Sequence, residues 1–134
     1  PRSSSAASDV YKRQVLLQPN KIAVNSVDET FLTKAKEVVE KYIADENFSV
    51  EQFSDEMAMS RVQIHRKLRA LTDQSASQFI VSLRLQRAVD LMKQSAGTVS
   101  EIAYMTGFNT PHYFGKCFRK QFGCSPSEYK EKHF

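Results

Sequence analysis

Basic side chains recur within nine residues of this sequence, beside an apolar stripe on the same predicted helix. Ile64, Leu68 and Leu71 make the stripe, and their spacing of three and four residues is that of one buried helix face. The basic side chains lie off that face: Arg61, His65, Arg66 and Arg69. A guanidinium has parallel N–H donors that match the oxygens of a phosphate or the paired acceptors of a guanine edge. The pattern therefore favours non-covalent recognition of an anionic, acceptor-rich partner.

A second group of the same character lies nearer the C-terminus. Phe114, Phe118 and Phe122 recur at helical spacing and predict another buried face. Polar side chains occupy other sides of that helix: His112, Tyr113, Lys116, Arg119 and Lys120. A second interpretation stays open for both groups, because basic residues on a helix are often only a solvated face.

No pattern in the sequence is typical of a catalytic or metal site. It has no glycine-rich phosphate loop, no clustered metal ligands, and no nucleophile at a suitable spacing from a base. Cys117 and Cys124 are expected to be unpaired, reduced thiols, since they make neither a disulfide framework nor a ligand set. We therefore expect no enzyme activity, no catalytic residue, no metal and no cofactor.

The charge is unevenly distributed along the 134 residues, whose formal net charge is +4. Residues 28–57 carry nine acidic and three basic side chains, whereas residues 61–93 carry seven basic and two acidic ones. This asymmetry suits a phosphate-rich partner for the later helices. The chain has room for one compact domain or two very small ones, and it contains no apolar run long enough to span a bilayer.

The segment from Thr98 to Tyr129 has the start and stop signals of two helices joined by a tight turn. Thr98 with Glu101 predicts a capping box, and Gly107 suits the turn because glycine tolerates positive φ. Ile102, Ala103 and Met105 are expected on the apolar side of the first helix. Thr110 before Pro111 predicts the start of the second helix, and Gly123 predicts its end. These signals indicate a helix-turn-helix.

An earlier copy of the same unit follows from an internal repeat. Ser49 with Gln52 and Ser60 with Gln63 predict two helix starts around a turn at Ala58. At an offset of 49 residues, Ser49, Phe53 and Ala58 match Thr98, Ile102 and Gly107. At an offset of 50, the matches are Ser60, Ile64, Leu68, Arg69, Ser75, Ser77 and Phe79 with Thr110, Phe114, Phe118, Arg119, Ser125, Ser127 and Tyr129. Matches in cap, turn and core positions predict two copies of one motif.

Other helices complete the predicted architecture. A capping box at Ser26 and Glu29 predicts a first helix that ends near Ala44, and Ser125 with Glu128 predicts a last short one. Ser75 with Gln78 predicts a connector to about Gln94, and about 17 residues at 1.5 Å each give a rod of roughly 25 Å. Together with the width of the two motifs, this rod would separate their second helices by ~34 Å, the length of one DNA turn.

The expected domain organisation follows from these elements. Residues 1–25 are expected to be a tail that is either foreign to the natural protein or disordered. Residues 26–74 form the first helix-turn-helix subdomain, residues 75–95 the connector helix, and residues 96–134 the second subdomain.

Two stretches resemble a known family. AYMTGFNTPHYF and FRKQFGCSPSEY are similar to the signature of the DNA-binding domain of AraC/XylS-type transcription regulators, and the likeness covers about residues 27 to 132. The first copy resembles the form found at the C-terminal end of hybrid two-component regulators. The resemblance implies an all-α, homeodomain-like fold of about seven helices, with two helix-turn-helix subdomains joined by a long connector. It also implies that both recognition helices enter successive major grooves of double-stranded DNA.

Site residues are carried over by position from this resemblance. Base readout is expected from the exposed early part of each recognition helix: Arg61, Val62, His65, Arg66, Pro111, His112, Tyr113, Gly115 and Lys116. Phosphate contacts are expected from the helix N-termini and the later basic residues: Ser60, Arg69, Thr110, Arg119 and Lys120. His112 and Tyr113 suit either role. Arg84 and Arg87 on the connector have two interpretations, a phosphate contact or an internal ion pair with the acidic helices.

The expected function is sequence-specific binding of double-stranded DNA that regulates transcription, as an activator that contacts RNA polymerase. The alternative is a protein-interaction module that docks a polymerase subunit or a partner regulator domain. The DNA site is expected to be asymmetric, because the two copies expose different residues. No membrane contact is expected of this domain, and any dimerisation would use domains outside this sequence. The expected location is the cytoplasm, either as a free regulator or as the cytoplasmic end of a membrane-spanning one.

Overall fold

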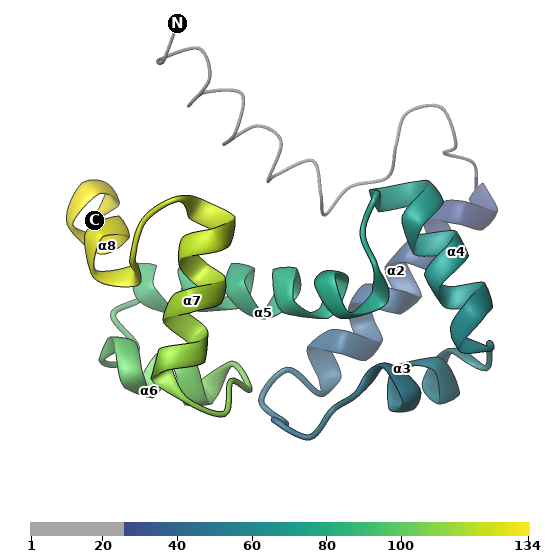
Figure 1. Cartoon of the computed structure of the whole chain (residues 1–134), viewed down its shortest axis with the longest axis horizontal. Coiled ribbons are helices and arrows are strands. Elements are labelled where there is room, and N and C mark those ends of the chain that lie inside the picture. The colour runs from purple at the N-terminus through teal and green to yellow at the C-terminus, as the bar shows by residue number, and fades with distance from the viewer. Residues whose placement is uncertain (1–25) are drawn as a thin grey trace, which may run out of the picture. The chain divides into compact units, whose positions relative to one another are not determined.

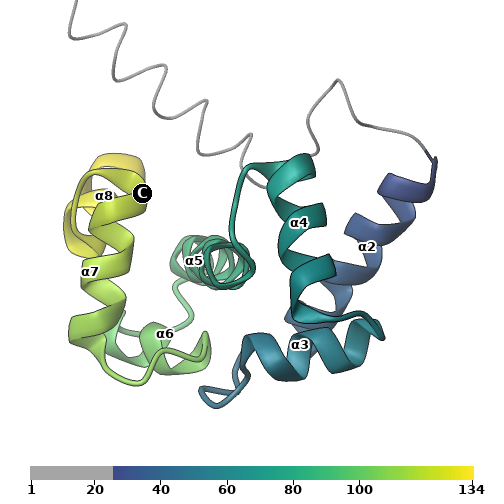
Figure 2. The ribbon, with the colours of Figure 1, turned by 45° about the vertical axis from the view of Figure 1, so that its right-hand side comes forward.

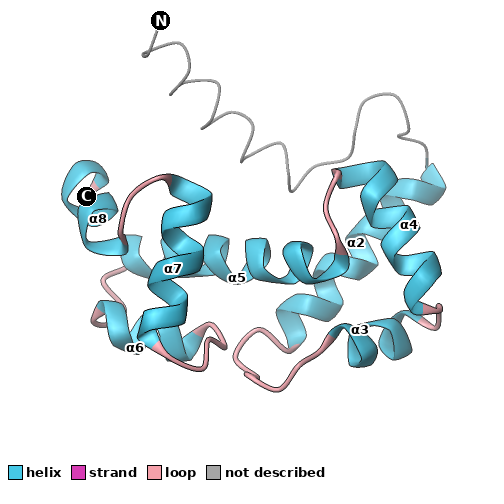
Figure 3. Ribbon diagram, viewed as in Figure 1, coloured by secondary structure: helices cyan, strands magenta, loops and turns pink. Residues whose placement is uncertain are grey.

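The computed structural model describes residues 26–134, and all the regular structure in this part of the chain is helical (Figures 1 and 3). The predicted tail, residues 1–25, lies outside the described residues. Seven helices are present between Ser26 and Phe134. Their bounds are α2 Ser26–Lys41, α3 Val50–Met57, α4 Arg61–Thr72, α5 Ala76–Lys93, α6 Val99–Met105, α7 Pro111–Phe122 and α8 Pro126–His133. The all-α prediction is confirmed. None of these helices combines the length and the apolar character needed to cross a membrane.

The chain divides into two compact units, which are described separately below. Unit 1 contains the described residues up to Lys41 and Ser49–Ile80. Unit 2 contains Tyr42–Phe48 and Val81–Phe134. The segment Tyr42–Phe48 therefore joins α2 to α3 along the chain but packs with the second unit.

Unit 1 is built from α2, α3, α4 and the first residues of α5. Figures 1 and 2 show α4 beside α2, with α3 at one end of the pair. Phe53 of α3 and Phe79 of α5 are fully buried and stack with ring centroids 6.1 Å apart. On α4, the stripe predicted from the sequence is buried, with Ile64 and Leu68 at 0% exposure. Packing of this stripe leaves the basic residues of α4 on the outside.

Unit 2 has an aromatic core beneath α7. Leu85 and Met92 of α5, Ile102 of α6, and Phe114 and Phe118 of α7 are buried in one cluster. Phe118 is surrounded by rings, with centroids at 5.7 Å from Phe114, 4.5 Å from Phe122 and 5.4 Å from Tyr129 of α8. Phe114 and Phe118 are thus core residues, and α8 lies beside α7 to complete that core (Figures 1 and 2).

The repeat seen in the sequence is also present in the backbone. Ala58 ends α3 with φ 54°, and the matching Gly107 after α6 has φ 82°. Asp73 ends α4 with φ 59°, and the matching Gly123 ends α7 with φ 79°. Left-handed residues thus occupy the same two places in each copy. This correspondence supports two copies of one supersecondary unit.

The predicted caps are present in both copies. Reciprocal capping boxes join Ser60 with Gln63, Thr98 with Glu101, and Ser125 with Glu128. Ser49 and Thr110 accept a bond from the backbone N–H three residues later. Ser75 and Gln78 exchange the two bonds of a capping box before α5. Each bond lies within four residues, so local sequence was enough to locate most helix starts.

Three expectations about the helices were wrong. Ser26 is the first residue of α2, rather than the cap preceding it. α2 ends at Lys41, three residues before Ala44, and the carbonyl groups of Ile43 and Asp45 beyond its end accept bonds from Arg84. Met105 is 38% exposed, whereas Ile102 and Ala103 are buried. Met105 is the last residue of the seven-residue helix α6, and its side chain ends beside Gly97 rather than in the buried cluster.

Candidate nucleic-acid interface

α4 presents two exposed rows beside its buried stripe. Successive residues of a row are four positions apart, and such residues lie on the same side of a helix. One row is Arg61, His65 and Arg69, and the other is Val62, Arg66 and Ala70. All six residues are exposed, and Val62 is 64% exposed although it is apolar. Five of the predicted DNA-contacting residues therefore lie together on the outer surface of unit 1.

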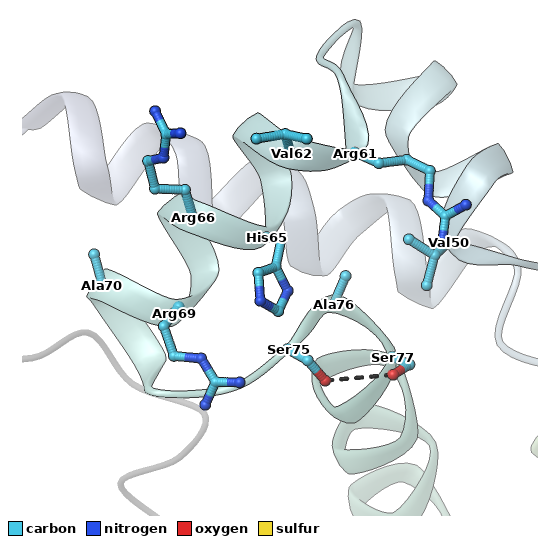
Figure 4. Close-up of a pocket in the computed structure, with 10 residues that line it drawn as sticks. All are labelled: Val50, Arg61, Val62, His65, Arg66, Arg69, Ala70, Ser75, Ala76 and Ser77. Carbon is cyan, nitrogen blue, oxygen red and sulfur yellow. Dashed lines mark hydrogen bonds between the residues drawn. The ribbon is translucent and has the colours of Figure 1, made fainter.

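An open pocket of ≈ 790 Å³ lies between α4 and the start of α5 (Figure 4). In Figure 4 the His65 ring and the Arg69 guanidinium extend toward the first residues of α5, whereas Arg66 extends away from them. The Oγ atoms of Ser75 and Ser77 are 3.3 Å apart at the same rim. The lining residues are Val50, Arg61, Val62, His65, Arg66, Arg69, Ala70, Ser75, Ala76 and Ser77.

The chemistry of this pocket suits an anion. Its lining has three guanidinium groups, one imidazole and two hydroxyl groups, and no carboxylate. It also borders the N-terminus of the 18-residue helix α5, where the helix dipole places partial positive charge. Arg69 is partly engaged, because its Nη1 donates to the Asp73 carbonyl at 3.2 Å and lies 3.9 Å from Asp73 Oδ1. Arg61 and Arg66 remain exposed on α4.

α7 carries the second set of residues that are predicted to contact DNA bases. His112, Tyr113 and Lys116 are exposed, and Pro111 and Gly115 are half-buried. No atom outside the local helix backbone lies within 4 Å of the position that a Cβ on Gly115 would occupy. Packing within the described structure therefore does not require glycine at this position of the helix.

Tyr113 is held more firmly than its 49% exposure suggests. Its ring lies 6.0 Å from the buried Phe108 ring. A hydrogen bond with the Cys117 thiol, together with partial burial, raises the pKa of Tyr113 above its ordinary value, although Arg84 opposes the shift. The phenol therefore remains protonated at neutral pH and can donate a hydrogen bond.

The predicted phosphate contacts lie at the two ends of α4 and of α7. Ser60 and Thr110 are exposed N-caps whose hydroxyl oxygens accept backbone bonds. Arg119 is exposed near the end of α7, with its Nη2 3.8 Å from Glu128 Oε1, and Lys120 is exposed beside it. The Arg119 ion pair is solvated, so it leaves the guanidinium able to bind another anion.

Neither interpretation of Arg84 was correct. Arg84 is only 5% exposed, and its guanidinium donates to three backbone carbonyl groups. It is therefore too deeply buried to contact a phosphate, and carbonyl oxygens take the place of the expected carboxylate. Arg87 is exposed on the same helix.

Sequence reasoning did not assign a binding role to the start of α5. Ser75, Ala76 and Ser77 line the pocket, but the sequence indicated only that Ser75 caps a helix. Val50 and Ala70 also line it without having been predicted. A helix start soon after a basic helix was the available signal, because a helix N-terminus attracts anions. Among the described residues no group of three or more His, Cys, Asp or Glu could hold a metal ion, and Cys117 and Cys124 are free thiols.

Known proteins resemble this chain in sequence and in fold. A family model described as a helix-turn-helix domain matches residues 53–132. Histidine kinase P4 of Formosa agariphila is 38% identical over 117 residues, which are 87% of this chain and 8% of that protein. The HTH-type transcriptional activator RhaS of Escherichia coli is 28% identical over 134 residues, covering 96% of this chain and 47% of RhaS. The chain thus spans less than half the length of both relatives.

A solved structure extends the likeness to three dimensions. It is the DNA-binding domain of AdpA, a global transcriptional factor, in complex with a target DNA. The TM-score is 0.65 at 30% identity, and the match covers 75% of this chain and 92% of that one.

Proposed function

Because the chain belongs to the AraC-type family of helix-turn-helix domains, we propose that it binds double-stranded DNA sequence-specifically through α4 and α7 and regulates transcription. The family is one of DNA-binding regulators and not of enzymes. The observation that carries the proposal is the exposed basic surface of α4, where Arg61 and Arg66 lie outside the buried stripe of the same helix. The AdpA domain, which binds DNA, has the same fold at 30% identity.

Each recognition helix would enter a major groove of the same duplex, in successive turns. A major groove admits one α-helix, and the N-terminal residues of that helix reach the base edges. The base-reading residues we propose are Arg61, Val62, His65, Arg66, Pro111, His112, Tyr113, Gly115 and Lys116. The phosphate-binding residues we propose are Ser60, Arg69, Thr110, Arg119 and Lys120.

The two helices would contribute unequally to specificity. Lys116 occupies the position in α7 that Arg66 occupies in α4, at the repeat offset of 50 residues. A guanidinium can donate two parallel bonds to guanine O6 and N7, whereas an ammonium group is a point charge with less geometric preference. The first copy would therefore specify bases more strongly, and the second copy would contribute more to anchoring. The DNA site would be asymmetric.

The wider context is also a proposal. RhaS, whose match covers 96% of this chain and 47% of RhaS, is described as a transcriptional activator, so activation through contact with RNA polymerase is the expected outcome of binding. The similarity to a histidine kinase favours a two-component regulator as the whole protein. The location would be the cytoplasm, where a bacterial regulator meets its DNA.

Selection of bound sequences from a pool of random duplexes tests the proposal directly. We expect enrichment of one asymmetric sequence with two informative segments about one helical turn apart. A footprint on the selected duplex should protect both segments at ~150 mM salt, where non-specific phosphate contacts are strongly weakened. Equal affinity for random and selected duplexes, or protection of a single groove, would contradict the proposal.

Gly115 provides a second test that separates folding from binding. Alanine at this position meets open space and should stabilise α7 by up to about 1 kcal/mol, the difference in helix propensity. If the glycine permits close approach of α7 to DNA, the Gly115→Ala variant should be more stable to urea but bind the selected duplex more weakly. Equal binding by the variant and the wild type would show that Gly115 has no role in the interface.

A further inference from the structure

Arg84 makes a buried three-way contact in unit 2. It lies on α5 at 5% exposure. Its Nη1 donates to the Ile43 carbonyl at 2.9 Å and to the Thr106 carbonyl at 2.9 Å, and its Nη2 donates to the Asp45 carbonyl at 3.0 Å. One guanidinium thus joins α5 to the 42–48 segment and to the turn between α6 and α7.

Backbone dipoles stabilise this buried cation. Thr106 is the C-cap of α6, so its carbonyl group carries part of the negative end of that helix. Burial lowers the pKa of Arg84 below its ordinary value, while the nearby Asp45 and Tyr113 oppose that shift. Since arginine remains protonated in proteins, the cation depends on these carbonyl groups for its partners. Loss of the guanidinium would remove these bonds from one buried carbonyl group, that of Thr106, and from two part-buried ones.

Gly107 lies beside the same contact, where there is no room for a side chain. It has φ +82°, where a side chain would strain the backbone. A Cβ at this position would also collide with Nη1 of Arg84 and with the Ile43 carbonyl oxygen. Gly107 is therefore required both by the turn and by the close approach of Arg84.

Only a short stretch of chain separates this contact from α7. Phe108 follows Gly107, is 2% exposed, and packs with its ring centroid 5.0 Å from that of Phe114. Thr110 then caps α7, which begins at Pro111. A shift of the Thr106–Gly107 backbone would therefore be passed on to the first turn of α7.

We propose that Arg84 is a positioning residue for DNA recognition, which orients the start of α7 by fixing the α6–α7 turn without touching DNA. This inference rests on the proposed function, since it assigns Arg84 a role in the reading of one of the two DNA segments. Arg84 and the three carbonyl groups that it binds are called the Arg84 clamp below.

The test compares Arg84→Met with Lys93→Met, an exposed lysine on the same helix. The selection experiment is repeated with both variants, at a temperature where circular dichroism shows each to be folded. Arg84→Met should lose base preference in the segment read by α7, with affinity weaker by roughly 5- to 150-fold, the equivalent of one good base contact. Base preference in the segment read by α4 should remain, and the Lys93→Met variant should keep its base preference in both segments.

Two further measurements keep the test decisive. Arg84→Lys retains the charge and serves as the probe if Arg84→Met does not fold; it should show the same selective loss, because one ammonium group cannot reproduce the planar fork. Amide hydrogen exchange of free Arg84→Met or Arg84→Lys should become faster from Gly107 to Tyr113 than in the middle of α7. This readout does not depend on DNA.

The outcomes separate the two proposals. Selective loss of base preference at the segment read by α7, with faster exchange at the α6–α7 turn, would support the positioning role of Arg84. Equal weakening at both segments, or no change in either, would overturn it while leaving the proposed function in place. If the wild type selects no duplex, the proposed function fails, and unchanged exchange at the turn would overturn the positioning role independently.

Discussion

Replacing Arg66 with alanine is expected to weaken binding to the selected duplex by about 1–3 kcal/mol and to relax base preference at one position. Arg66 is exposed on α4 and points away from α5 in Figure 4, so the change should not disturb the core. The physical reason is the loss of two parallel donors that can pair with guanine O6 and N7. Competition binding against a panel of single-base variants of the duplex measures both effects.

Lys120→Ala is the matched comparison for Arg66→Ala. Lys120 is exposed near the end of α7, where a phosphate contact carries no sequence information. Its loss should weaken binding to every duplex alike. The slope of log affinity against log salt concentration should become shallower by about 1, the amount expected for one phosphate contact. If the two variants lose affinity equally for all sequences, the division between base readout and phosphate binding is wrong.

Replacing Phe118 with alanine is expected to lower the free energy of unfolding by about 3–5 kcal/mol. Phe118 has 0% exposure, and the rings of Phe114, Phe122 and Tyr129 surround it. Truncation removes apolar contacts and leaves a cavity that the neighbouring rings cannot fill completely. Such a loss is a large part of the ~5–15 kcal/mol that stabilises a small protein. Urea denaturation followed by circular dichroism measures it.

Tyr104→Ala is the control for Phe118→Ala. Tyr104 is an aromatic residue of the same unit, on α6, but it is 53% exposed. Surface substitutions usually change stability by less than ~0.5 kcal/mol, so this variant should unfold almost as the wild type does. Similar losses from both substitutions would mean that the aromatic core of unit 2 does not have the importance assigned to it.

The competing interpretation, a protein-interaction module, predicts different results. Binding to a polymerase subunit or partner regulator domain through apolar faces would depend weakly on salt and would give no DNA protection. Arg66→Ala would then leave the main interaction intact. DNA binding predicts the opposite pattern, with strong salt dependence and loss of base preference.

The candidate site could be predicted from the sequence only in part. The exposed rows of α4 and α7 followed from helical periodicity, because burying one stripe fixes which residues face outward. The pocket could not be read in this way. It needs the start of α5, with Ser75 and Ser77, to lie against the row of Arg61, His65 and Arg69, and that juxtaposition is a property of packing.

By itself, the sequence determined most of the helix starts, the turns and the duplication. The capping bonds of Thr98 and Glu101 lie within three residues, so the local order of residue types was sufficient to predict them. Only the tertiary structure decided the role of Arg84 and the place of the 42–48 segment. The acceptors of Arg84 are 22, 39 and 41 positions away, and they are backbone carbonyl groups. Every residue has such a carbonyl, so no sequence pattern marks the ones that a folded chain brings to a buried arginine.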